Sequence, residues 1–185
     1  MNIKTAAFLG GHAYMPGNKE YEDAKQTAKL LAKSGLMILN GGGSGIMRAS
    51  TEGAKQGGGT VLAVTTYYGG YGRKNFEGVD LENKFDKEVI ADDYFERTEK
   101  LLRMGDVHII FNGGSGTVSE FGMTWAMSKI HDGANKPIIL FGEFWKEILK
   151  VMQKNMLIKQ GEEMLFRVVT KPDEVLDVIN SIRTR

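Results

Sequence analysis

The chain has 185 residues, 42% of them hydrophobic and 25% charged, and its 24 basic and 23 acidic side chains give a formal net charge of +1. This length and composition predict a single globular domain over residues 1–185 with one core. The balanced charge argues against nucleic acid or an anionic membrane as a partner. Because the chain has no cysteine, disulfides, thiolate catalysis and cysteine-ligated zinc are excluded.

The first residues lack a signal-peptide pattern and run directly into an apolar strand. No apolar stretch is long enough to span a bilayer. We therefore expect a cytoplasmic protein that has no membrane partner.

Short apolar runs alternate with segments of helical periodicity along the chain. The predicted strands are 5–9, 36–39, 60–65, 87–90, 107–111, 137–141 and 166–170. The predicted helices are 19–34, 45–56, 94–104, 117–130, 144–156 and 172–182. Most strands are apolar on both faces, which is typical of a parallel sheet covered on both sides. The pattern predicts an α/β fold: a three-layer, Rossmann-like domain with a mainly parallel sheet and helices on both faces.

The alternation is interrupted between Tyr67 and Asp86. This stretch is polar and contains Tyr-Tyr-Gly-Gly-Tyr-Gly followed by mixed charges. We interpret it as a long surface loop and leave open whether it closes over a ligand as a lid.

Glycine is unusually frequent, with 24 residues against three prolines. Three glycine clusters directly follow predicted strands, at Gly10–Gly11, Gly41–Gly45 and Gly113–Gly116. The carboxyl ends of parallel strands meet at one sheet edge, so the clusters should converge on one crevice. A glycine-rich turn that leads into a helix presents several N–H groups and the positive end of the helix dipole, which favours phosphate. The alternative is that the loops are tight turns without a ligand.

Neither long glycine loop matches a standard nucleotide motif. No Gly-Lys-Ser or Gly-Lys-Thr follows, and the Gly41 loop is not G-x-G-x-x-G with an acidic residue in the usual place. These absences weaken both ATP hydrolysis of the P-loop kind and simple NAD binding.

Two charged residues each have two interpretations. Thr117 and Glu120 have the spacing of a capping box, in which Glu120 would only cap a helix. Alternatively, Glu120 points into the crevice and orients a water or stabilises charge on a ribose. The charge run around Arg97 is by itself typical of a solvated helix face.

The histidines show no metal-ligand spacing, so we predict no metal and no cofactor, and we expect His108 to be a hydrogen-bonded core residue.

Several motifs together resemble the LOG ("lonely guy") family. They are Glu96-Arg97, Gly113-Gly114-Ser115-Gly116-Thr117-Val118-Ser119-Glu120, Gly41-Gly42-Gly43-Ser44-Gly45-Ile46-Met47, Thr124-Trp125 and Lys136-Pro137. Such proteins often carry a lysine decarboxylase label, but nothing here marks a lysine for the pyridoxal phosphate which that chemistry normally needs. The resemblance covers nearly the whole chain.

The resemblance implies a Rossmann-like fold, usually dimeric, that hydrolyses the N-glycosidic bond of a nucleoside 5′-monophosphate such as AMP. Free base and ribose 5-phosphate would be the products, with Arg97 and Glu120 as catalytic residues. The glycine clusters and the matching motifs together give the candidate nucleotide-binding residues, which are Gly10, Gly11, Gly42, Gly43, Gly45, Met47, Gly113, Gly114, Ser115, Gly116 and Thr117.

Four positions depart from the family pattern. Asn112 replaces a proline, Thr98 replaces a lysine, Met127 stands where many members have glutamine, and Gly11-His12 stands where they have Ser-Ser. These departures support an alternative hypothesis, a non-catalytic carrier of a nucleotide or of a molybdenum-cofactor-like ligand. The expected partners are a nucleoside monophosphate and further copies of the chain. An apolar face with Phe121, Trp125 and Ile130 would form either a dimer interface or core.

Overall fold

The computed structural model of the protein describes residues 2–66, 80–130, 136–159 and 161–183. The strands are β1 (Thr5–Leu9), β2 (Met37–Asn40), β3 (Val61–Thr66), β4 (Lys87–Ala91), β5 (Val107–Ile110), β6 (Ile138–Phe141) and β7 (Phe166–Val169). The α-helices are α1 (Lys19–Lys33), α2 (Ile46–Gln56), α3 (Tyr94–Met104), α4 (Ser115–Ile130), α5 (Phe144–Asn155) and α6 (Pro172–Arg183). A short 3-10 helix, η2 (Glu162–Leu165), precedes β7.

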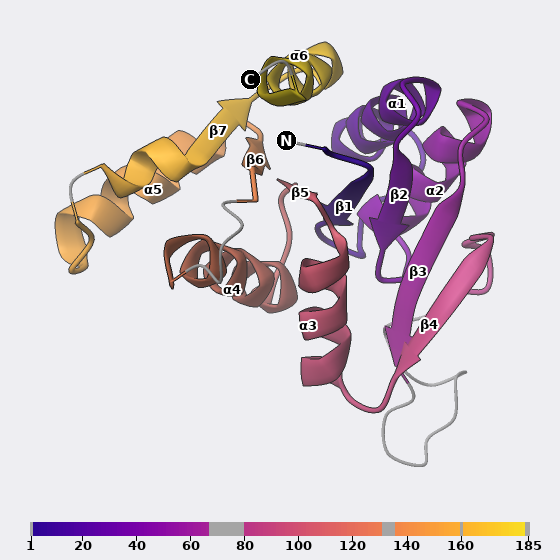
Figure 1. Ribbon diagram of the computed structural model, residues 1–185, viewed down its shortest axis with the longest axis horizontal. Helices are drawn as coiled ribbons and strands as arrows, with labels where there is room; N and C mark the ends of the chain where they lie inside the picture. The colour runs from indigo at the N-terminus through magenta and orange to yellow at the C-terminus, as the bar shows by residue number, and fades with distance from the viewer. Residues whose placement is uncertain (1, 67–79, 131–135, 160, 184–185) are drawn as a thin grey trace.

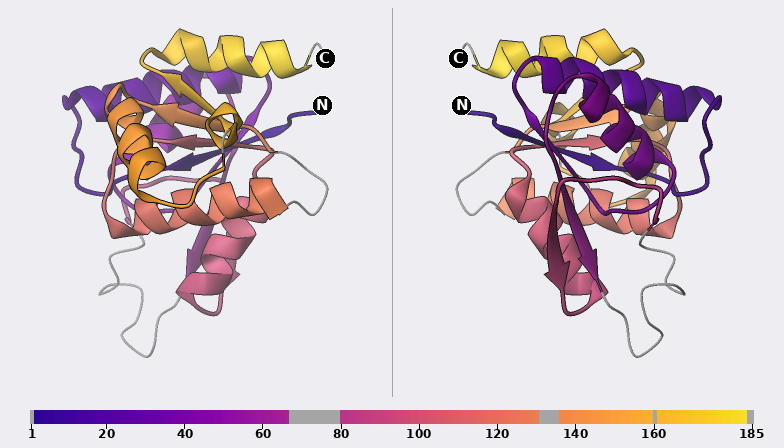
Figure 2. Two further views of the ribbon diagram at one scale, coloured as in Figure 1. Left: turned by 90° about the vertical axis from the view of Figure 1, so that its left-hand side faces the viewer. Right: turned by 90° about the vertical axis from the view of Figure 1, so that its right-hand side faces the viewer.

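The seven strands form one parallel sheet in the order β4-β3-β2-β1-β5-β6-β7. Helices α1, α2 and α6 cover one face, and α3, α4 and α5 cover the other (Figures 1 and 2). The predicted three-layer α/β fold is therefore confirmed. Every residue of β3 and β6 is buried, as expected for strands covered on both faces.

Each face of the sheet carries its own apolar core. On one face, Tyr21 of α1, Ile46 of α2 and Val175 of α6 belong to the same cluster as the strand residues Phe8 and Ile38. The opposite cluster is formed by strand residues together with Leu101, Leu102, Phe121 and Trp145. The two clusters hold the ends of the helices against the sheet, which positions the loops between them.

The sheet order reverses at β1, which pairs with β2 on one side and with β5 on the other. Ligands in open α/β sheets bind outside the carboxyl ends of the strands at such a switch point. The loops that follow β1, β2 and β5 lie at this edge, so the predicted convergence of the three glycine clusters is confirmed.

The start of α4 differs from the prediction. The helix begins at Ser115, two residues before the predicted start at Thr117. The Val118 N–H donates to the Gly114 carbonyl at 3.0 Å, and the helical turn that this bond closes includes Ser115 and Gly116 as well as Thr117. The sequence did not reveal this because Ser115 and Gly116 are typical of a turn.

Most of the predicted loop from Tyr67 to Asp86 lies outside the described residues, and so does the lid interpretation. Its last part packs against the β2 loop: the Asp80 N–H donates to the Gly42 carbonyl and the Asn83 side chain donates to the Gly43 carbonyl.

Among the helices of the described ranges, none combines the length and apolar character needed to cross a membrane.

The apolar residues of α4 have different environments. Phe121 is buried, with ring centroids 5.7 Å from Trp125 and 4.9 Å from Trp145, so it belongs to the core. Ile130 is 76% exposed. The formation of homodimers or larger oligomers stays a prediction.

Candidate functional site

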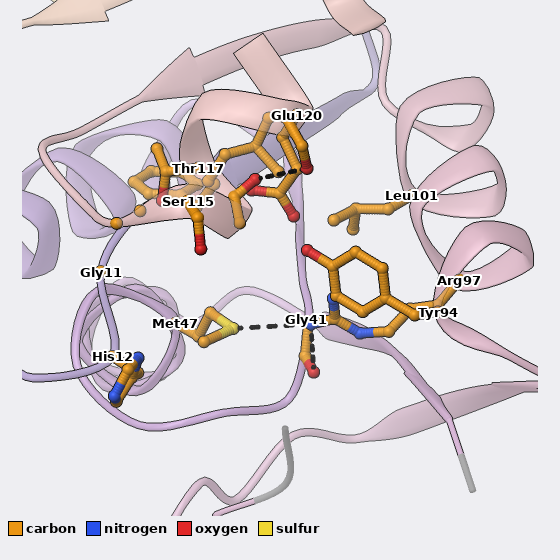
Figure 3. Close-up of a pocket in the computed structure, with 16 residues that line it drawn as sticks. Gly11, His12, Gly41, Met47, Tyr94, Arg97, Leu101, Ser115, Thr117 and Glu120 are labelled. Atoms are coloured by element: carbon orange, nitrogen blue, oxygen red, sulfur yellow. Dashed lines mark hydrogen bonds between the residues drawn. The ribbon is translucent and has the colours of Figure 1, made fainter. Parts of the chain in front are cut away.

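A cavity of about 630 Å³ lies at the carboxyl ends of β1, β2 and β5 (Figure 3). Its lining combines residues from the β1, β2 and β5 loops with residues of α2, α3 and α4. The lining residues are Phe8, Leu9, Gly10, Gly11, His12, Gly41, Met47, Tyr94, Arg97, Leu101, Gly114, Ser115, Gly116, Thr117, Ser119 and Glu120. The volume is in the range of small-molecule sites in proteins.

The end of the β5 loop (residues 111–114) and the first turn of α4 line this cavity. Among the described residues, no protein acceptor takes the N–H groups of residues 114–117, which form the end of the loop and the first turn of α4. Gly114 and Ser115 are exposed. Free amides at the positive end of a helix dipole are the arrangement that favours an anion.

Gly113 does not line the cavity but determines how the β5 loop approaches the β1 loop. A Cβ at Gly113 would overlap the Thr117 side chain and lie 2.7 Å from the Gly11 nitrogen. The Gly11 N–H donates to the Asn112 carbonyl at 2.9 Å. Glycine at position 113 is therefore required for the two loops to lie in contact.

The β2 loop (residues 41–45) is closed by the protein itself. Asn40 accepts the Gly42 N–H, and the carbonyls of Gly42 and Gly43 accept from Asp80 and Asn83. Gly42, Gly43 and Gly45 are buried and are not among the cavity-lining residues. Glycine is needed at two of these positions for the backbone conformation of the turn, because Gly42 has φ +73° and Gly45 has φ +62°.

Arg97 lies against the β2 loop and is only 6% exposed, so the solvated-face interpretation of its charge run is wrong. Its Nε donates to the Val64 carbonyl at 3.1 Å and its Nη2 donates to the Gly41 carbonyl at 3.1 Å. A Cβ at Gly41 would overlap Nη2, so this approach requires glycine there. Met47 completes the contact, with its sulfur 3.9 Å from Nη2.

Glu120 lies one turn into α4 and faces the same cavity (Figure 3). It is 7% exposed and, among the described residues, its carboxyl group has no hydrogen-bond partner and no ion pair. Burial raises the pKa of Glu120 to about 7, although the charge of Arg97 acts in the opposite direction. The capping-box interpretation is wrong, because α4 begins at Ser115 and places Thr117 inside its first turn.

Sequence reasoning missed several lining residues, above all Tyr94 and Leu101 of α3. Tyr94 is the first residue of α3 and lies three residues before Arg97, a spacing that places both on one side of a helix. Its ring lies 5.7 Å from the Arg97 guanidinium carbon. That spacing was the available signal, since Arg97 was already a candidate.

The histidines have separate environments. His108 is buried in β5, and its Nε2 donates to the Leu102 carbonyl at 2.9 Å, so the prediction of a hydrogen-bonded core residue is confirmed. Burial lowers the pKa of His108 to about 4, so the ring is neutral at physiological pH. His12 is exposed and lines the cavity. Within the described ranges, no three acidic, histidine or cysteine side chains are grouped so that they could hold a metal ion.

Comparison with known proteins identifies the sequence family. A model of the SLOG cluster4 family matches residues 5–175. An uncharacterized protein of Archaeoglobus fulgidus is 32% identical over 123 residues, which are 66% of this chain and 75% of that protein.

Solved structures agree on the fold. A molybdenum cofactor binding protein from the phototrophic bacterium Rippkaea orientalis has a TM-score of 0.73 at 22% identity, with 98% of both chains covered. The molybdenum cofactor carrier protein of Chlamydomonas reinhardtii has a TM-score of 0.71 at 16% identity, with 100% of both chains covered. The DNA processing protein A of Helicobacter pylori has a TM-score of 0.60 at 14% identity, covering 96% of this chain and 80% of that one.

Proposed function

The chain belongs to the SLOG cluster4 family, and from this premise we propose that it is a binding protein that carries a small phosphorylated ligand of the nucleotide or molybdenum-cofactor type. The observation that carries the proposal is the set of unpartnered amides of residues 114–117 at the edge of a ligand-sized cavity. Donors of this kind, at a helix N-terminus, bind phosphate without a lysine.

The charges of the cavity favour one phosphate group rather than a polyphosphate. Of the described residues that line it, only Arg97 and His12 are basic. Two donor nitrogens of Arg97 already donate to main-chain carbonyls. Because little positive charge is free, we expect neutral amides and hydroxyls to hold the phosphate.

Binding without turnover is supported by the contacts of Arg97, one of the two residues that hydrolysis would need. Its Nε and Nη2 already donate to the carbonyls of Val64 and Gly41. Two proteins of this fold that match over nearly their whole length are named as binding or carrying the molybdenum cofactor. The proposal extends that role, for a ligand of this general kind, to the present chain.

The test compares two variants that each add one negative charge to α4. Ser115→Asp places a carboxylate at the free amides and should weaken AMP binding about tenfold or more in a calorimetric titration. Gly122→Asp is the matched control, because Gly122 is exposed, has no atom within contact distance of an added Cβ, and does not line the cavity. It should leave the affinity within about twofold of wild type.

A second experiment asks what the purified protein holds. We expect mass spectrometry of the denatured protein to release an intact phosphorylated ligand that stays bound over hours. Absence of any phosphorylated ligand, together with no measurable binding of AMP or GMP, would overturn the proposal.

Hydrolysis of a nucleoside 5′-monophosphate is the second candidate function. The observation that favours it is that Glu120, with a pKa near neutrality, lines the same cavity as Arg97. Incubation with AMP should then release free adenine, and Glu120→Gln should abolish the release while AMP still binds. Release by wild type that Glu120→Gln abolishes would replace the carrier proposal with the hydrolase.

The expectation that nucleic acid is not a partner also needs a test, because the Helicobacter pylori protein of this fold binds single-stranded DNA. Anisotropy of a labelled single-stranded oligonucleotide should remain unchanged on addition of the protein. Saturable binding that AMP displaces would assign the cavity to nucleic acid instead.

A further inference from the structure

Tyr94 is a cavity residue that no sequence motif marks. Asp93 caps α3 by accepting the Glu96 N–H at 2.8 Å, and the Thr98 hydroxyl donates to the Tyr94 carbonyl at 2.9 Å. These contacts hold the backbone of Tyr94 at the first residue of the helix. The Arg97 guanidinium lies 5.7 Å from the ring, within the range of a cation–π contact.

The hydroxyl of Tyr94 reaches the start of the opposite helix. A Cβ at Gly116 would lie 3.0 Å from the Tyr94 oxygen, so this oxygen is next to the free amides of the first turn of α4. Figure 3 shows the side chain extending from α3 toward the residues of α4. Among the described residues, no partner donates to this hydroxyl or accepts from it.

A second observation indicates that this end of the cavity receives a ligand. Glu120 is more than nine-tenths buried, lines the cavity and, within the described ranges, has no hydrogen-bond partner. Buried polar groups in folded proteins are almost always hydrogen-bonded, to protein, water or a ligand. Two side chains without a hydrogen-bond partner among the described residues, Tyr94 and Glu120, therefore line the cavity together with the first turn of α4.

We infer that Tyr94 is a specificity-determining residue: its hydroxyl donates to a phosphate group bound at the start of α4 and selects phosphorylated ligands over their dephosphorylated forms. The inference rests on the proposed function, since it concerns the same ligand. A neutral hydroxyl suits this position, because Arg97 is held by the main chain and no lysine is among the described residues that line the cavity. A hydrogen bond to a charged group is worth more than one to a neutral group.

The test measures the dissociation constants of AMP and adenosine for the wild type and for Tyr94→Phe. The phenylalanine keeps the ring against Arg97 and removes only the oxygen. We expect AMP affinity to fall about tenfold or more while adenosine affinity stays within about twofold. Tyr14→Phe is the matched control, because Tyr14 contacts the β1 loop beside Gly11 but does not line the cavity. It should leave the ratio of the two constants unchanged.

The outcomes separate the two claims. An unchanged preference for AMP in Tyr94→Phe would overturn the role of Tyr94 and leave the proposed function intact. A wild type that binds AMP no better than adenosine would overturn both. An equal loss for AMP and adenosine would assign Tyr94 a role in the shape of the cavity and would also overturn the inference; thermal unfolding of the variant shows whether the fold has changed.

Discussion

The β2 loop and the β5 loop have almost the same sequence and opposite structural roles. One reads Asn40-Gly-Gly-Gly-Ser-Gly and the other Asn112-Gly-Gly-Ser-Gly, and both lead from a buried strand into a helix. The four glycines of the first loop are buried, and the carbonyls of Gly41, Gly42 and Gly43 accept hydrogen bonds from Arg97, Asp80 and Asn83. The second has exposed residues and leaves the amides of residues 114–117 without a protein acceptor.

The difference comes from the neighbours of each loop. The Gly11 carbonyl accepts the Ile46 N–H at the start of α2, and Asp80 and Asn83 donate to the loop carbonyls. No such segment covers the start of α4 among the described residues. A glycine-rich turn is therefore accessible to a ligand only when the rest of the fold leaves it exposed.

The largest expected effect is the difference in stability loss when one glycine of each loop is replaced by alanine. Gly45→Ala should destabilise the protein by at least about 3 kcal/mol, because Gly45 has φ +62° and its Cβ would overlap the Gly11 carbonyl and lie 2.7 Å from Cα of His12. Gly114→Ala in the other loop meets no atom within 4 Å and should change stability by less than about 0.5 kcal/mol. Urea unfolding measures both, and equal losses would contradict the distinction.

The next effect concerns two equivalent positions in the helices that follow the loops. Ala49 of α2 lies four residues after Gly45, and Glu120 of α4 lies four residues after Gly116. Burial raises the pKa of Glu120 from its ordinary value of 4.5 to about 7, so the native state holds this proton more tightly than the unfolded state. Stability from the neutral carboxyl is therefore fully present below about pH 4.5, is lost as the pH rises through about 7, and then levels off, a total of about 3 kcal/mol.

Unfolding free energies across this pH range, taken as the difference between wild type and Glu120→Gln, check the prediction. The difference should change only between the two pKa values. Glu147→Gln, at an exposed position of α5, is the control and should show no such change. A flat difference for Glu120→Gln would mean that its carboxyl group is not buried in the native protein.

The asparagine that precedes each loop gives a smaller contrast. Asn40 is fully buried; it accepts the Gly42 N–H and donates to Met47, Ser50 and Thr51. Asn40→Ala leaves these groups unsatisfied and should cost about 2 kcal/mol, whereas Asn112→Ala at an exposed position should cost less than about 0.5 kcal/mol. Thermal unfolding of both variants measures the two losses of stability. A larger loss for Asn112→Ala than for Asn40→Ala would contradict the closed state of the β2 loop.

The serines give the smallest contrast. The Ser44 hydroxyl donates to the His12 carbonyl at 2.8 Å, so Ser44→Ala should cost about 1 kcal/mol. The Ser115 hydroxyl has no partner in the described part of the chain, and Ser115→Ala should leave stability unchanged. Precise denaturant titrations of both variants are needed; a larger loss for Ser115→Ala would reveal a stabilising contact at the open loop.

Much of the fold could be predicted because it depends on local patterns. The buried apolar runs and the helical periodicity predicted the bounds of β1 and α3 without error and those of the other strands and α-helices to within one or two residues. The start of α4 was misplaced because Ser115 and Gly116 favour turns, and only the Gly114–Val118 hydrogen bond shows that they are helical.

The site was harder to predict because its members come from distant segments. The burial of Arg97 depends on the absence of a side chain at Gly41, 56 positions earlier in the chain. Tyr94 was missed because its role depends on the position of Gly116 across the cavity. The resemblance supplied Arg97, while the local charge run alone pointed to solvent.

The sequence by itself determined the alternation of strands and helices, the parallel sheet and the meeting of the glycine loops at one edge, because periodicity and turn chemistry are local and parallel strands share a carboxyl edge. Only the tertiary structure decided which glycine loop is open. That difference depends on hydrogen bonds from Asp80 and Asn83 to the β2 loop and from Ile46 to Gly11. These long-range partners occupy carbonyls of the β2 loop and bury it, whereas no such segment covers the start of α4 in the part of the chain that the structure describes.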